Sequence, residues 1–146
     1  MSAVQRHAIV VGAGIGGLTA ALALGRRGWR VTVCERAAGP SSVGAGIVLA
    51  PNALRAFATI GFDITRAAGR TLPAAMGLRR PDGRWLNRAD GAALAARYGG
   101  PPLALHRSAL AEALTAALPA GTVRHRVAVT TEDDADRSPE VRTSAG

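Results

Sequence analysis

The segment AIVVGAGIGGLTAALALGRRGWRVTVCER, residues 8–36, contains the pattern of a strand, a glycine turn, a helix and a second strand. Its first four residues form a short apolar run that is typical of a strand buried on both faces of a parallel sheet. The alternation over residues 30–35 predicts the second strand. Between them a helix is expected to begin near Ile15, and its narrow apolar face consists of Leu18, Ala21, Leu22 and Gly25. The segment therefore predicts an α/β fold.

Three glycines in the first turn, Gly12, Gly14 and Gly17, stand in G-x-G-x-x-G order. In this fingerprint the first glycine permits a tight turn, the second lets the backbone approach a pyrophosphate, and the third lets the helix pack closely on the strand. The helix that starts around Ile15 and Gly16 directs its free N–H groups and positive dipole end at the same turn. A diphosphate can thus be held without a lysine, and the pattern predicts a Rossmann-like βαβ unit that binds a dinucleotide.

An acid, Glu35, ends the second strand eighteen positions after Gly17. It is placed to accept hydrogen bonds from an adenosine ribose, which FAD and NAD both contain, so the residues alone leave both cofactors open. A βαβ unit whose site is never filled is the alternative. The uncharged run over residues 8–25 also raises the possibility of a signal or membrane segment, but its five glycines argue against a membrane partner.

The length of 146 residues favours one domain, and an aromatic content of only 3% predicts a core of small and aliphatic side chains. All 18 basic residues are arginine, giving a net charge of +8, but they are dispersed. A nucleic-acid partner would require a basic stripe with aromatic platforms, which this dispersal disfavours. The single cysteine, Cys34, excludes an internal disulfide and makes a reducing cytoplasm the simplest setting. Three scattered histidines predict no metal site.

The remaining chain alternates between helical and extended patterns. Pro51 suits the first turn of a second helix, which Gly61 ends, and Asp63 is a candidate N-cap for a short helix through Ala67. The other expected elements are a β-hairpin over 74–88, a loop over 89–102 that can include a helical turn, a strand at 103–106, a helix over 108–118, one strand over 123–129 and a strand at 141–143. The hairpin departs from the βαβ pattern and is interpreted as an insertion.

The βαβ core, which we place at residues 4–36, and two later segments, 43–62 and 105–114, together resemble the FAD-dependent monooxygenases of the aromatic hydroxylase type, such as salicylate and 3-hydroxybenzoate hydroxylases. The resemblance implies FAD as cofactor, NADH or NADPH as reductant, and transfer of oxygen to a small aromatic substrate. It also implies a cofactor site in which glycines surround the diphosphate, an acid takes the ribose, and later residues reach the adenosine and the flavin: Gly12, Gly14, Ile15, Gly16, Gly17, Glu35, Arg36, Gly46, Ile47 and Arg107.

Two further motifs of that family, a later Asp-Gly and a Gly-Asp, have no counterpart, because Asp82-Gly83 and Asp90-Gly91 come too early. We therefore expect residues 1–146 to be a partial FAD-binding domain, truncated at its C-terminus and without a substrate domain. No catalytic residue can be assigned, and no turnover is expected from this chain alone. The alternatives are a nonenzymatic FAD- or ADP-binding module, a nicotinamide-dependent oxidoreductase domain, and a poorly stable fragment with an exposed sheet edge.

Overall fold

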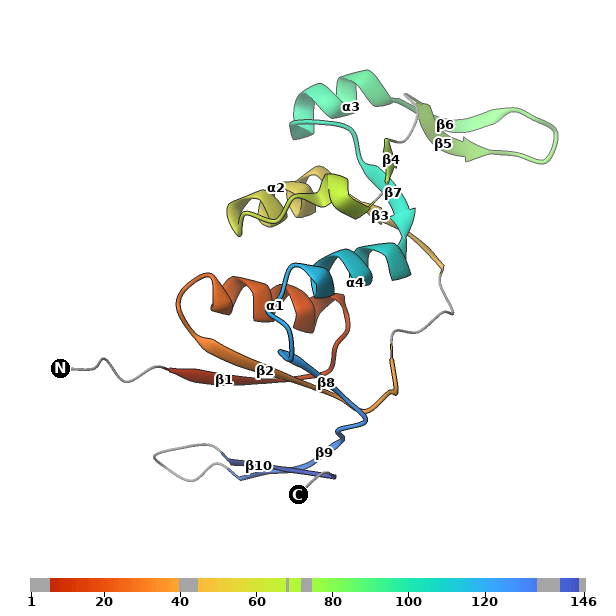
Figure 1. The fold of residues 1–146 in the computed structure, drawn as a ribbon. Coiled ribbons are helices and arrows are strands. Elements are labelled where there is room, and N and C mark those ends of the chain that lie inside the picture. Colours follow the sequence, from red (N-terminus) through yellow and green to blue (C-terminus); the bar gives the residue numbers. More distant parts are fainter. Residues whose placement is uncertain (1–5, 40–44, 68, 72–74, 134–139, 145–146) are drawn as a thin grey trace. The chain divides into compact units, whose positions relative to one another are not determined.

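The chain divides into two compact units, which are described separately (Figure 1). The first combines the parts of the chain up to residue 44 and from residue 110 onwards, and the second, residues 45–109, is inserted between them. The computed structural model describes residues 6–39, 45–67, 69–71, 75–133 and 140–144. Within these ranges no helix is long and apolar enough to cross a bilayer.

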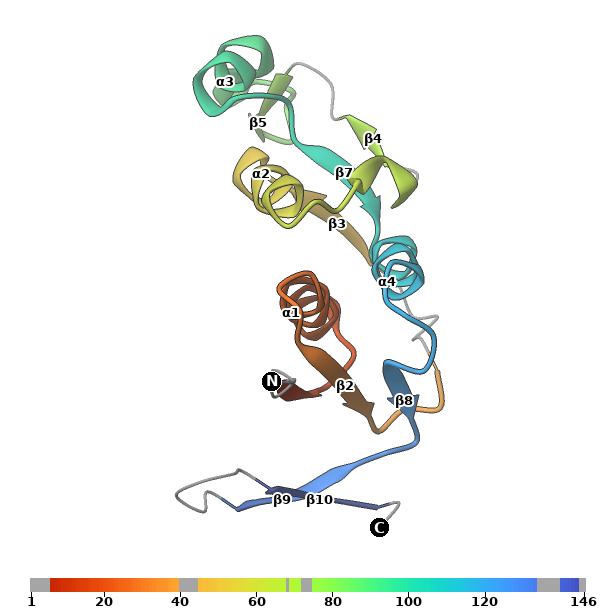
Figure 2. The ribbon, with the colours of Figure 1, turned by 60° about the vertical axis from the view of Figure 1, so that its left-hand side comes forward.

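The first unit is built on a parallel sheet in the order β1-β2-β8. Its strands are β1 (His7–Val11), β2 (Arg30–Glu35) and β8 (Val123–His125). Helix α1 (Ile15–Gly25) connects β1 to β2 and lies against both strands (Figure 2). The βαβ unit predicted from the glycine pattern is therefore confirmed.

The core of the first unit is small and aliphatic, as the composition predicts. Leu18 and Ala21 of α1 are buried against the sheet, where Val33 is fully buried. Helix α4 (Arg107–Ala116) contributes Leu110 and Leu114, which are also fully buried. Each such leucine or valine contributes about 1.5–3 kcal/mol by leaving water, so this layer is a main source of the unit's stability.

The prediction of a single strand over residues 123–129 is wrong, because two strands lie there. Strand β8 ends at His125 because Arg126 adopts a positive φ of 60°, a left-handed conformation that interrupts an extended backbone. The chain resumes in an antiparallel pair, β9 (Val129–Asp133) and β10 (Glu140–Thr143), the second of which confirms the strand expected near the C-terminus.

The second unit contains a small antiparallel sheet in the order β3-β7-β4. Helix α2 (Pro51–Thr59) follows β3 with its proline in the first turn, and Gly61 ends it at a φ of +66°, as predicted. The short helix expected up to Ala67 is a 3₁₀ helix, η1 (Ile64–Ala67). The strands are β3 (Gly46–Leu49), β7 (Leu103–His106) and β4 (Arg70–Thr71).

The segment over residues 89–102, expected to be a loop with at most a helical turn, contains a longer helix, α3 (Gly91–Tyr98). The Asp90 carboxylate accepts a hydrogen bond from the Ala92 N–H (2.9 Å), and Gly99 ends the helix at a left-handed φ of 83°. The Arg55 guanidinium of α2 donates to the carbonyl of Tyr98 at the same end. The sequence signals of this helix are an acid at its N-cap, an alanine-rich run and a glycine at its C-terminal end.

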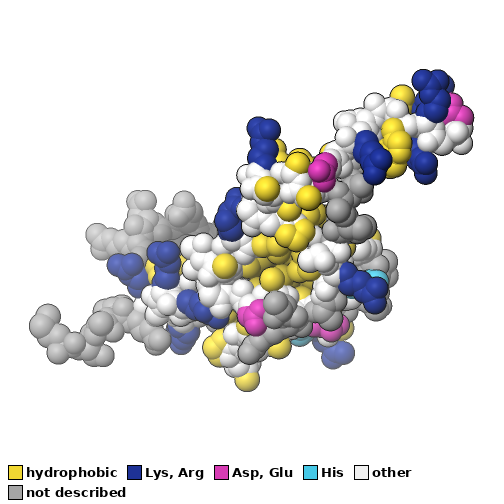
Figure 3. All heavy atoms as spheres, turned by 90° about the horizontal axis from the view of Figure 1, so that it is seen from above, with side chains coloured by type: hydrophobic (Ala, Val, Ile, Leu, Met, Phe, Trp, Pro, Cys, Tyr) yellow, Lys and Arg dark blue, Asp and Glu magenta, His cyan; other side chains and the backbone are white. Residues whose placement is uncertain are grey.

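The predicted β-hairpin is present as β5 (Ala75–Arg79) and β6 (Trp85–Asp90). Leu78 pairs with Asn87 but Arg79 pairs with Trp85, so a bulge at the intervening position shifts the register. Residues 77–88 are all exposed. Arginine and apolar side chains alternate on this arm in the space-filling view (Figure 3).

Candidate functional site

The glycine turn lies where β1 ends, at the carboxyl edge of the parallel sheet, which is the usual ligand edge of such folds. Gly12 has a φ of +94°, and its N–H donates to the carbonyl of Cys34 at 2.8 Å. A Cβ added to Gly17 would lie 2.0 Å from the Gly12 carbonyl oxygen. The first and third glycines thus perform the two structural tasks predicted for them, a tight turn and close packing of helix on strand.

The second glycine is different, because a Cβ added to Gly14 would meet no atom within 4 Å. Gly14 is the N-cap of α1 and provides no side-chain cap. The first intrahelical bond runs from the Leu18 N–H to the Gly14 carbonyl (2.9 Å), so the amides of residues 15–17 precede it. The first turn of α1 contains no acid. The helix therefore presents open space and a positively polarised end, which suits a diphosphate.

Glu35, at the end of β2, forms two short hydrogen bonds to backbone amides. Its Oε2 accepts from the Ala13 N–H at 2.7 Å, and its Oε1 accepts from the Ala37 N–H at 2.8 Å. The Ala37 and Ala13 amides stabilise the charged form and hold the pKa of the Glu35 carboxyl below its usual value, although partial burial opposes them. The carboxylate is therefore ionised at neutral pH, and each oxygen keeps a further lone pair for a ribose hydroxyl.

The neighbourhood of Glu35 is basic. Arg36 follows it and is exposed, while His125 of β8 lies opposite Glu35 in the parallel register. Among the described residues, His125 Nδ1 is buried without a hydrogen-bond partner. The Val127 N–H donates to the Glu35 carbonyl at 2.9 Å. Sequence reasoning could not identify the amides that bind Glu35, because a backbone N–H is supplied by almost any residue type. It also treated His125 as an ordinary strand position and did not foresee that it lies opposite Glu35.

The remaining predicted residues form a group in the second unit. Gly46 and Ile47 lie on β3, opposite His106 and Leu105 of β7. The N–H of Arg107, the first residue of α4, is 3.4 Å from the carbonyl oxygen of Ala45. These three predicted residues thus meet at one end of the β3–β7 pair. The other seven, from Gly12 to Arg36, belong to the first unit.

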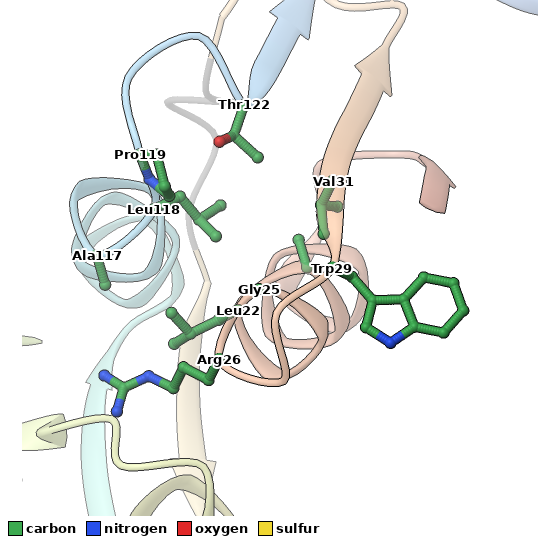
Figure 4. A pocket seen from close by; sticks show the side chains of 10 residues that line it. Leu22, Gly25, Arg26, Trp29, Val31, Ala117, Leu118, Pro119 and Thr122 are labelled. Atoms are coloured by element: carbon green, nitrogen blue, oxygen red, sulfur yellow. The ribbon is translucent and has the colours of Figure 1, made fainter. Parts of the chain in front are cut away.

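A separate cavity of about 280 Å³ lies in the first unit beside the C-terminal half of α1. The side chains of Leu22 and Leu118 point into it from opposite walls, whereas the Trp29 ring turns outward (Figure 4). Its wall includes Gly25, the last residue of α1. An eleven-residue helix is about 16 Å long, so this hollow is remote from the glycine turn at the other helix end.

Known proteins match almost the whole chain. Residues 7–142 match the family model described as FAD dependent oxidoreductase. The 3-amino-4-hydroxybenzoate 2-monooxygenase PtnB3 of Streptomyces platensis is 39% identical over 127 residues, which cover 86% of this chain. The 3-hydroxybenzoate 6-hydroxylase of Polaromonas naphthalenivorans is 42% identical over 102 residues, or 68% of this chain.

A solved structure, Klebsiella pneumoniae HpxO complexed with FAD and uric acid, matches 97% of this chain with a TM-score of 0.83 and 27% identity. The match covers 36% of the HpxO chain. The two sequence matches above cover 32% and 25% of those relatives. This chain therefore spans about a third or less of the length of the proteins it matches.

Proposed function

The chain belongs to the FAD dependent oxidoreductase family, and from this membership we propose that its 146 residues form the FAD-binding portion of a monooxygenase acting on a small aromatic compound. The relatives named as acting on aminohydroxybenzoate and hydroxybenzoate support this substrate class. Bound FAD would supply the redox and oxygen chemistry, with NADH or NADPH as the proposed reductant. Because the chain spans about a third of such relatives, we expect no turnover from it alone.

The observation that carries the proposal is the open helix end at Gly14 beside an ionised Glu35. We propose that the amides of Ile15, Gly16 and Gly17 hold the diphosphate, that Glu35 accepts a ribose hydroxyl, and that Arg36 lies beside the adenosine. Gly46, Ile47 and Arg107 are proposed to serve the flavin end. A cytoplasmic setting is also proposed, because the single cysteine, Cys34, cannot form an internal disulfide.

The direct test is a visible absorption spectrum of the purified chain before and after addition of FAD and desalting. Retained flavin absorbance with one FAD per chain would support the proposal. A colourless chain that binds ADP would instead support the alternative of a nonenzymatic ADP-binding module. Tighter binding of NAD than of FAD or ADP in competition would favour the nicotinamide-dependent alternative.

A matched pair of glycine substitutions locates the binding site. A Cβ at Gly14 or at Gly25 meets no atom of the chain within 4 Å, so neither G14A nor G25A introduces a clash. We expect G14A to weaken ADP binding by about tenfold or more, because the methyl group intrudes where a diphosphate approaches. G25A, at the other end of α1, should bind as the unmodified chain does. Equal affinity in both variants would contradict the proposed location.

A further inference from the structure

The carboxylate of Glu35 connects two turns of the first unit. Oε2 accepts from Ala13, which lies between the first two glycines of the fingerprint, and Oε1 accepts from Ala37, just beyond β2. Both distances, 2.7 and 2.8 Å, are those of charge-assisted bonds. One side chain therefore joins the turn after β1 to the turn after β2.

From this bridge we infer that Glu35 is a positioning residue for the diphosphate, and not only a contact for the ribose. This inference rests on the proposed function, since it assigns how the same site is shaped. The glycine turn is fixed to β2 at two successive amides: Gly12 donates to the Cys34 carbonyl and Ala13 donates to the Glu35 carboxylate. The bond from Gly12 joins two backbone groups and continues the hydrogen bonding between β1 and β2. The bond from Ala13 depends on the side chain of Glu35.

The bridge also determines which amides face the ligand. Because the Ala13 N–H is already bonded to Glu35, it is not available to a phosphate. The amides of the first turn of α1 remain available, because they precede the bond from Leu18 to Gly14. Glu35 thus orients the N–H of the Gly12–Ala13 peptide away from the diphosphate and leaves the helix end to bind it.

No other described side chain performs this task. The N-cap of α1 is a glycine without a side-chain hydrogen bond, and the first turn contains no acid. A turn rich in glycine loses more conformational freedom on ordering than one with larger residues. The turn therefore relies on Glu35 to reach the conformation that binds phosphate.

The experiment uses inorganic pyrophosphate, which lacks a ribose, next to ADP, which has one. Both ligands are titrated into the ¹⁵N-labelled 146-residue chain and the amide shifts of residues 12–17 give the affinities. Glu35→Ala should weaken pyrophosphate by about tenfold and ADP by more than that, because ADP also loses its ribose contact, and it should shift the amides of Ala13 and Ala37. Glu112→Gln, which changes an exposed glutamate on α4, is the charge control and should alter neither affinity.

Glu35→Gln keeps one acceptor oxygen and loses the other, so it should retain one of the two amide bonds and weaken pyrophosphate less than Glu35→Ala does. It also provides the test if Glu35→Ala fails to fold. Loss of ADP affinity with unchanged pyrophosphate affinity in the Glu35 variants would overturn the inference and leave Glu35 as a ribose contact. If the unmodified chain binds neither ligand, the proposed function fails and the inference falls with it.

Discussion

Two of the described glycines lie directly against a backbone carbonyl, Gly17 at the start of α1 and Gly77 on the β5–β6 hairpin. A Cβ on Gly17 would lie 2.0 Å from the Gly12 oxygen, and one on Gly77 would lie 2.1 Å from the Asn87 oxygen. Gly17 belongs to a unit with fully buried side chains, whereas the hairpin around Gly77 exposes Trp85 at 43%. A glycine packed against a carbonyl therefore lies beside a buried core and a candidate site in the first unit, but only in an exposed hairpin in the second unit.

The largest effect is expected from Gly17→Ala, because the new methyl group forces α1 away from β1. We expect a loss of about 1–3 kcal/mol in the free energy of unfolding, measured by urea denaturation with circular dichroism. Gly16→Ala is the matched control, since its Cβ meets nothing within 4 Å and replacing a helical glycine by alanine gains roughly 0.5–1 kcal/mol. A lower free energy of unfolding for Gly17→Ala and a higher one for Gly16→Ala would show that Gly17 is required for close packing. Equal free energies of unfolding in the two variants would contradict that role.

Gly77→Ala should act locally, although its steric conflict is nearly as severe. The added methyl group meets the Asn87 carbonyl and the Trp85 ring, so the hairpin should open. Because the hairpin is exposed, we expect the global free energy of unfolding to change by less than about 1 kcal/mol. Amide hydrogen exchange should show lost protection in β5 and β6 only. A global destabilisation as large as that of Gly17→Ala would show that the arm supports a core after all.

A smaller effect is expected where α2 meets the end of α3 in the second unit. Arg55→Gln removes the cation that donates to the Tyr98 carbonyl, a bond at an exposed helix C-terminus. We expect a loss of about 0.5–1 kcal/mol in the local stability of α3, measured by amide exchange. Arg97→Gln is the comparison variant, because it also removes a cation from this helix end but no hydrogen bond to the Tyr98 carbonyl: Arg97 belongs to the last turn of α3, and its guanidinium lies over the Tyr98 ring, 5.7 Å from the centroid. Equal losses would argue against a specific role for the Arg55 bond.

The smallest effect on stability is expected from protonation of Glu35 when the pH is lowered. The pKa of Glu35 is lower in the folded chain than the ordinary glutamate value of about 4.3, so its ionised form stabilises the fold fully above that value. This contribution is lost as the pH falls through the lower, folded-state pKa. Glu35→Gln should flatten the decline in stability measured between pH 5 and pH 2 by roughly the part that Glu35 contributes. An unchanged acid profile would mean that the two amide bonds contribute little to folding.

The sequence predicted best what local patterns determine. The β1-α1-β2 unit followed from apolar alternation and glycine spacing, and β2 has the predicted bounds of 30–35. The hairpin followed from the turn at Pro81-Asp82-Gly83. Helix α3 was expected as no more than a helical turn although Asp90 and Gly99 cap it, because its short alanine-rich run has no strong apolar periodicity.

What could not be predicted depends on contacts between distant segments. Arg126 is not a residue type that signals a positive φ, and the break it makes depends on its N–H donating to the Ala37 carbonyl. The bridge from Glu35 to Ala13 and Ala37 likewise involves amides that any residue would supply. At the site, the types of residue were thus predictable, whereas the hydrogen bonds that orient them were not.

The insertion of the second unit has a consequence for how the chain is made. Strand β2 ends at Glu35 but its neighbour β8 begins only at Val123. At about 5–20 residues per second, a ribosome needs roughly 4–18 s to synthesise the intervening segment. During that interval β1, α1 and β2 emerge with one edge of β2 unpaired, while all of residues 45–109 become available to fold. Closure of the parallel sheet is therefore a late, long-range step in biosynthesis.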